Sequence, residues 1–226
     1  MENEIIGLLS SIEKKLNSSS ISPRIRASMI KELEKAKSRY RNFDSGIIKG
    51  ETQKQVYESL LKKGRALVKN GKNLNEVYSF LRYANAAYFD FTDALGPLNA
   101  GIRLFTLTSA LFIALSPQFL GAAFSLVFIL PIFLGLNALK KRRTLGYTMA
   151  LFLLPVSLAV STLWLRFGYR VLTDYSGVLS ETVEATGKSP EFARFLITIP
   201  PLLSILLLFS ACLMAYKLFK ARDMLV

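Results

Sequence analysis

The stretch Leu104–Leu139, LFTLTSALFIALSPQFLGAAFSLVFILPIFLGLNAL, runs for 36 residues without a charged side chain. A helix rises about 1.5 Å per residue, so about 20 residues cross a hydrocarbon core that is about 30 Å thick. The stretch is long enough for two crossings, and Ser116-Pro117-Gln118 supplies a turn between them. A helix in a soluble core needs a polar face, which this stretch lacks. The sequence therefore predicts a helical hairpin in a membrane.

Two further uncharged runs, Thr144–Leu165 and Phe195–Tyr216, are each 22 residues long. Each is long enough for one more crossing. We therefore predict that residues 94–226 form a four-span transmembrane domain, with a loop at 166–194 and a short tail after the last span. The loop is expected to contain a short helix at 176–185, and Ser189-Pro190 is expected to start the helix that leads into the fourth span. The predicted spans lie at about 98–116, 119–139, 144–165 and 195–216.

Residues 1–93 show a different pattern, in which apolar residues recur every three or four positions between charged ones. Ile5, Leu9, Ile12 and Leu16 are the first such stripe. This spacing is typical of amphipathic helices, and the segment has room for about four. One such helix is marginal in water, so the stripes are expected to pack together as a helical bundle. The predicted class is all-α, and the fourth helix is expected to continue through Gly96-Pro97 into the first span.

The distribution of basic residues predicts the orientation in the membrane, because short cytoplasmic loops are enriched in Lys and Arg. Residues 140–143 are all basic, and the tail after residue 216 has three basic residues and one acidic. Residues 1–100 have 17 basic and 11 acidic residues, a net charge of +6, whereas 166–194 is neutral. We therefore predict a multi-pass protein of the cell membrane, with 1–93 and both termini in the cytoplasm and 166–194 outside it.

The cluster Lys140, Lys141, Arg142 and Arg143 has three possible roles. It can act only as a topology signal, which is the interpretation that its position favours. It can also attract anionic lipid headgroups, at about 1 kcal/mol per basic residue near the surface. Binding of nucleic acid phosphates is the third possibility. Readers of single-stranded nucleic acid usually interleave aromatic residues with basic ones, and this short loop has none, so a nucleic acid partner is not favoured.

Asp90 and Asp93 are weak candidates for a site of acid–base chemistry or cation binding, because carboxylates three residues apart share a helix face. No histidine exists anywhere in the chain to complete such a site. The two residues end the aromatic stretch Tyr78–Phe91, which is typical of a membrane-interface belt combined with bundle core. We favour that structural interpretation.

Four prolines in the predicted spans are candidate helix kinks: Pro131, Pro155, Pro200 and Pro201. A proline inside a helix removes one backbone hydrogen bond and clashes with the preceding turn. Broken helices line substrate sites in some transporters, although prolines are also frequent in other membrane helices.

No catalytic, cofactor-binding or metal-binding motif is present, and the single cysteine, Cys212, cannot form an internal disulfide. We therefore expect a non-enzymatic auxiliary or scaffold subunit whose basic helical domain docks a partner protein or anionic lipid. The expected protein contact is either a different partner or a further copy of the chain in a homo-oligomer. The alternative is an oligomeric transporter or channel component for a neutral or lipid-like molecule. A third class, a membrane enzyme, would have to use Asp90, Asp93, Glu181 or Glu184.

Overall fold

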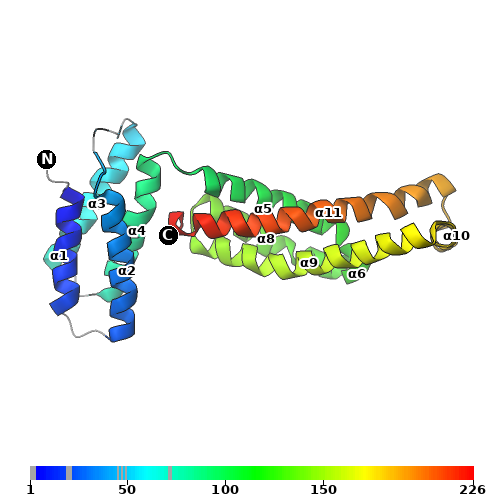
Figure 1. Cartoon of the computed structure of the whole chain (residues 1–226), viewed down its shortest axis with the longest axis horizontal. Helices are drawn as coiled ribbons and strands as arrows, with labels where there is room; N and C mark the ends of the chain where they lie inside the picture. Colours follow the sequence, from blue (N-terminus) through cyan, green and yellow to red (C-terminus); the bar gives the residue numbers. More distant parts are fainter. Residues whose placement is uncertain (1–3, 19–21, 45, 47, 49, 71–72) are drawn as a thin grey trace. The chain divides into compact units, whose positions relative to one another are not determined.

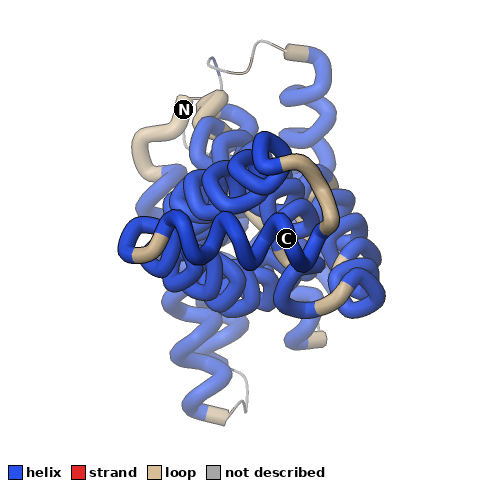
Figure 2. Tube along the Cα trace, turned by 90° about the vertical axis from the view of Figure 1, so that its right-hand side faces the viewer, coloured by secondary structure: helices blue, strands red, loops and turns tan. Residues whose placement is uncertain are grey.

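The computed structural model describes residues 4–18, 22–44, 46, 48, 50–70 and 73–226. Within these residues the regular structure is helical and contains no strand, which confirms the predicted class (Figures 1 and 2). The chain divides into two compact units. The first unit comprises Met1–Gly96 together with Asp223–Val226, and the second comprises Pro97–Arg222.

In the described part of the first unit, four α-helices share one hydrophobic core. They are α1 (Glu4–Ser18), α2 (Pro23–Tyr40), α3 (Glu51–Asn70) and α4 (Leu74–Phe91). All four residues of the first apolar stripe, from Ile5 to Leu16, are buried in this core. The apolar periodicity therefore identifies the residues that pack between the helices.

A cluster of aromatic side chains forms the part of the core that lies near the end of α2. The ring of Tyr40 meets those of Phe43 and Tyr88 edge to face, with centroids 5.4 and 5.6 Å away. The Tyr40 hydroxyl donates a hydrogen bond to the Ala84 carbonyl of α4, at 2.9 Å. Burial raises the pKa of Tyr40 far above its ordinary value, so this hydroxyl keeps its proton and remains a donor.

Helix α4 ends at Phe91, and α5 (Gly96–Leu115) begins five residues later. Asp93 has a φ of 50°, and the Ala94 amide donates to the Phe89 carbonyl at 3.0 Å. This arrangement is a Schellman motif, which terminates a helix. The prediction of one helix continuing through Gly96-Pro97 into the first span is therefore wrong.

Three helices are long and apolar enough to cross a membrane: Gly96–Leu115, Thr144–Thr173 and Pro190–Met224. They lie in the second unit, except that Gly96, Asp223 and Met224 at their ends belong to the first. The last of these helices is α11 (Pro190–Ala221) with a 3₁₀ turn after it. The first two are α5 and α9 (Thr144–Thr173), and the shorter helices are α6 (Pro117–Leu120), α7 (Ala122–Val127), α8 (Ile129–Lys140) and α10 (Tyr175–Thr186).

The region predicted as the second span, 119–139, is not one continuous helix. Gly121 has a φ of 77° and separates α6 from α7, and a turn at Phe128 separates α7 from α8. Pro131 has no amide proton, so it cannot donate to the Val127 carbonyl, and this weakens the helix just before α8. The buried Ser116 hydroxyl donates a hydrogen bond to the Ser125 hydroxyl at 2.8 Å. This bond links the residues on the two sides of the break at Gly121.

Glycines bring the helices of the second unit close together. A Cβ atom on Gly146 of α9 would lie 2.6 Å from the backbone nitrogen of Leu139 in α8. A Cβ on Gly101 of α5 would lie 2.6 Å from the Leu218 side chain of α11. Small residues allow membrane helices to approach closely, which is how they gain packing contacts in an apolar solvent.

The predicted loop 166–194 is almost entirely helical. Helix α9 continues to Thr173, α10 follows, and α11 begins at Pro190, so α9 and α11 run side by side (Figure 1). Val171, Val178 and Ile197, one from each helix, form a small core of their own. Helix α9 extends beyond the predicted span end at residue 165, because Arg166 ends the uncharged run without ending the helix. The helix predicted at 176–185 is present as α10, and the helix start predicted at Ser189-Pro190 is the start of α11.

Candidate functional site

The basic cluster forms the turn between α8 and α9. Arg142 has a φ of 56°, and the Arg143 amide donates to the Ala138 carbonyl at 2.8 Å. The turn is therefore a Schellman motif with an arginine at the left-handed position, where glycine is usual. Lys140, Lys141 and Arg143 are exposed. A residue other than glycine is about 1 kcal/mol less stable in the left-handed conformation. Arg142 therefore lowers the stability of the turn while it adds a positive charge.

Arg142→Gly is expected to stabilise the α8–α9 turn by about 1 kcal/mol, because glycine adopts positive φ without strain. Arg143→Gly removes the same charge at a φ of −89° and is expected to have no such benefit. Thermal unfolding of both variants in detergent measures the difference. Equal effects of the two substitutions would contradict the strain at Arg142.

Asp90 and Asp93 do not share a helix face as predicted, because Asp93 lies in the turn beyond the end of α4. Gln53 of α3 links the two residues instead. Its side-chain amide donates to the Asp90 carbonyl at 2.8 Å and to the Asp93 carboxylate at 3.3 Å. This contact ties α3 to the end of α4, which is a structural role. Within the described residues, no group of three or more His, Cys, Asp or Glu side chains could hold a metal ion.

The four prolines occupy different positions in their helices. Pro131 lies in the first turn of α8, just after the turn at Phe128. Pro155 lies inside α9, and Pro200 and Pro201 lie inside α11, and neither helix is interrupted there. A Cβ on Gly168 of α9 would lie 2.9 Å from the Pro201 ring. The prolines of α11 thus mark its close packing against α9.

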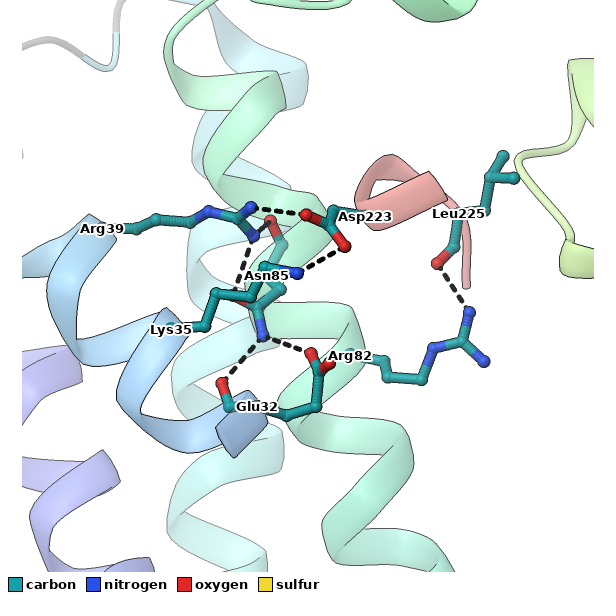
Figure 3. Close-up of polar contacts among 7 residues, drawn as sticks. All are labelled: Glu32, Lys35, Arg39, Arg82, Asn85, Asp223 and Leu225. Carbon is teal, nitrogen blue, oxygen red and sulfur yellow. Dashed lines mark hydrogen bonds and ion pairs between the residues drawn. The ribbon is translucent and has the colours of Figure 1, made fainter. Parts of the chain in front are cut away.

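A connected polar site lies in the first unit, and the sequence patterns did not predict it. We call Asp223–Val226 the clasp segment. The Asp223 carboxylate forms ion pairs with Lys35 at 2.5 Å and with Arg39 at 3.0 Å, both on α2 (Figure 3). The Leu225 carbonyl accepts a hydrogen bond from Arg82 of α4, also at 3.0 Å. Together, Lys35, Arg39, Arg82 and Asn85 form what we call the clasp site.

Contacts with two residues of α4 hold the Arg39 guanidinium in place. It donates to the Asn85 side-chain oxygen at 2.9 Å and lies over the Phe89 ring, 4.7 Å from the centroid. Asn85 is buried and donates in turn to the carbonyl and the carboxylate of Glu32, at 3.0 and 3.1 Å (Figure 3). The cation that meets Asp223 is thus oriented by α2 and α4 themselves.

The clasp segment also buries apolar surface. The exposed fractions of Met224 and Leu225 are 3% and 1%, whereas that of Val226 is 43%. Val226 lies at the edge of a groove of about 480 Å³ between α3 and α4. Lys63, Leu67, Phe80 and Tyr83 are among its lining residues. The segment thus combines a paired carboxylate, a bound main-chain carbonyl and two buried apolar side chains.

The ion pairs of Asp223 set the pH range in which the clasp is stable. Burial raises the pKa of Asp223, but its hydrogen bonds and charge interactions with Lys35 and Arg39 outweigh burial and hold it below 3.8, its ordinary value. A lowered pKa stabilises the bound state above the ordinary value, and this stability is lost as pH falls through the lowered value.

We therefore expect the clasp segment to stay bound from about pH 8 down to about pH 5 and to be released only in stronger acid. Hydrogen exchange of the segment at a series of pH values, corrected for the intrinsic pH dependence of exchange, measures this. Release near pH 6 would show that Asp223 is not held ionised by its two cations.

The geometry of this site binds an acidic segment of the chain through Lys35, Arg39 and Arg82. In the sequence the site leaves only a single acidic residue, Asp223, after three basic ones at 217, 220 and 222, and nothing local links it to α2. Comparison of the chain with models of protein families, with curated proteins and with solved structures found no match.

Proposed function

We propose that the protein is a non-enzymatic auxiliary or scaffold subunit of the cell membrane, whose helical first unit docks a partner protein at the cytoplasmic face. The observation that carries this proposal is the exposed surface of α3. Five of its basic side chains are exposed, against two acidic ones. The basic residues are Lys54, Lys62, Lys63, Arg65 and Lys69, of which Arg65 pairs with Glu4.

The apolar side of α3 is already used in the shared core, where Leu60 and Leu61 are buried. The basic side is therefore free to meet other molecules without unfolding the unit. Basic surfaces steer association with acidic partners and with anionic lipid. A protein partner is favoured over lipid alone because an apolar groove lies beside Lys63. A groove can bind a side chain of complementary shape, whereas charge alone attracts any anionic surface.

The membrane arrangement that we propose has four crossings, with the broken α6–α8 segment as the second. Helix α9 has 30 residues and is about 45 Å long, more than the roughly 30 Å of hydrocarbon. If the basic 140–143 turn lies at the cytoplasmic face, the last turns of α9 and all of α10 project on the opposite side. The neutral charge of 166–194 agrees with that placement.

Cross-linking in native membranes tests the docking function. An amine-reactive cross-linker followed by mass spectrometry is expected to join Lys62, Lys63 or Lys69 to one other protein in reproducible amount. Reversal of these three charges to Glu should remove that product, whereas Lys188→Glu in the second unit should not. Cross-links only within the chain or between its own copies would refute the proposal.

A second candidate function, an oligomeric transporter component for a lipid-like molecule, is favoured by one observation. A groove of about 450 Å³ lies between α9 and α11, beside the contact of Gly168 with Pro201. Leu165, Leu172, Leu202 and Ile205 also line it. Translocation of a fluorescent lipid in liposomes that is lost in Gly168→Phe would support this function, and unchanged translocation would exclude this groove as its path.

A further inference from the structure

We infer that the clasp site is a docking site for an acidic–apolar segment of a partner protein, and that the chain's own clasp segment competes for it. This inference rests on the proposed docking function of the first unit and names the chemistry of the partner. The segment expected to bind has a carboxylate followed by at least two apolar residues, in the pattern of Asp223, Met224 and Leu225.

The cationic part of the site does not depend on the clasp segment. Arg39 is held by Asn85 and Phe89, and Asn85 is held by Glu32, all of them on α2 or α4. Lys35 and Arg39 are four residues apart on α2 and share one face of it, so both remain on that face when the Asp223 carboxylate leaves. Two adjacent cations at a half-buried position attract a replacement carboxylate, because like charges without a counter-ion repel each other.

The remaining contacts select apolar residues, but they do not select particular apolar side chains. Arg82 binds the carbonyl of Leu225, which every residue possesses. Met224 and Leu225 fill buried space through apolar side chains alone. A segment with other apolar residues of similar volume would therefore fit, because volume-conserving exchanges between apolar side chains cost little.

The groove next to Val226 offers apolar space that Asp223–Val226 leave open. The clasp segment reaches this groove only with Val226, which is 43% exposed, and leaves most of about 480 Å³ open. A partner segment with further apolar residues would fill the space between Leu67, Phe80 and Tyr83. That added burial of apolar surface would strengthen the binding of the partner segment.

The two segments cannot occupy the site together, since both require Lys35 and Arg39. The clasp segment therefore lowers the apparent affinity for the partner by the fraction of molecules in which the site is free. Docking is expected to release Asp223–Val226 from the first unit. Binding of the partner therefore changes the conformation of these residues.

The test uses the full chain in detergent micelles and a fluorescent peptide, Gly-Asp-Met-Leu-Val-Leu-Phe, with binding followed by anisotropy. Asp223→Lys repels the clasp segment from Lys35 and Arg39 and is expected to raise the peptide's affinity about tenfold or more over the unsubstituted chain. Adding Lys35→Glu and Arg39→Glu to Asp223→Lys should abolish binding of the Asp peptide. The same peptide with Lys in place of Asp is the matched control and should not bind the Asp223→Lys protein.

A charge-reversed pair of protein and peptide shows whether a loss of binding is caused by the changed charges or by misfolding. The Lys peptide should bind the protein that carries Lys35→Glu and Arg39→Glu with an otherwise unchanged sequence, because its Asp223 is now repelled. Failure of that reversed pair, or an affinity that Asp223→Lys does not change, would overturn the inference. So would co-purification of Asp223→Lys chains with charge-reversed chains as dimers, since the occupant would then be the segment of a second copy.

The outcomes separate this inference from the proposed function. If α3 captures a partner but the peptide fails to bind, the docking function stands without the clasp site. If the peptide binds by the expected charge rules but no partner is cross-linked, the site exists and the proposed role of α3 is wrong.

Discussion

Gly146→Val is expected to destabilise the second unit by about 3 kcal/mol or more, which is the upper range for overpacking a close contact. The added Cβ would lie 2.6 Å from the Leu139 backbone nitrogen and 2.9 Å from the Gly135 carbonyl oxygen. Backbone cannot rotate out of the way as a side chain can, so α8 and α9 must move apart. The sole tryptophan, Trp164, reports on this unit because its indole donates to the Leu115 carbonyl at 2.9 Å.

Unfolding in mixed micelles, followed by Trp164 fluorescence, measures the loss. Gly7→Val is the control, since a Cβ on this exposed residue of α1 would meet nothing within 4 Å. Its effect on stability is expected to stay within about 0.5 kcal/mol. If Gly146→Val unfolds at the same point as Gly7→Val, the close approach of α8 and α9 is not present in the protein.

Phe91→Ala is expected to destabilise the first unit by about 3–5 kcal/mol, because it leaves a cavity in a packed core. The Phe91 ring is 1% exposed and lies against Phe43 and Tyr57, with centroids 5.3 and 5.9 Å away. Because these partners follow α2 or belong to α3, the cavity would affect more than α4. Hydrogen exchange is expected to rise in α2, α3 and α4 together.

Tyr78→Ala on the same helix is the matched control. Tyr78 is 37% exposed, so its loss is expected to cost less than about 1 kcal/mol and to leave exchange in α2 and α3 unchanged. If Phe91→Ala increased exchange in α4 alone, the four helices would not share a cooperative core.

The features predicted from the sequence are those that depend on local patterns. Uncharged runs identified three long apolar helices, since absence of charge over about 20 residues is a property of the chain itself. The start of α11 at Pro190 was also predicted from Ser189-Pro190, and the Ser189 hydroxyl accepts from the Phe192 amide at 3.4 Å. Capping chemistry lies within four residues and is therefore readable from the sequence.

Helix ends were predicted less well because charge and helix formation are independent. Arg166 interrupts the uncharged run of α9, but Phe167 and Val171 continue its buried side to Thr173. Conversely, no charge marks the breaks at Gly121 and Phe128, so hydropathy alone indicated one long segment there. Backbone geometry at a glycine, and an amide missing at Pro131, decided the structure instead.

The clasp site could not be predicted, because its contacts join residues far apart in the chain. Asp223 meets Lys35 and Arg39 more than 180 positions away, and each is one charge among many on its own helix. In the sequence Asp223 only reduced the positive charge of the tail. Tertiary structure converts it into the partner of two cations, which no local pattern encodes.

The central claim, a four-crossing protein with its helical unit and its basic turn on the cytoplasmic side, is tested most directly by cysteine accessibility in intact cells. Cys212→Ser provides the background, and single cysteines at Gly7, Lys141 and Gly177 are labelled with a membrane-impermeant maleimide. We predict that Gly177→Cys reacts from outside, whereas Gly7→Cys and Lys141→Cys react only after the membrane is permeabilised. Labelling of Lys141→Cys from outside, or opposite behaviour of Gly7→Cys and Lys141→Cys, would contradict the proposed crossings.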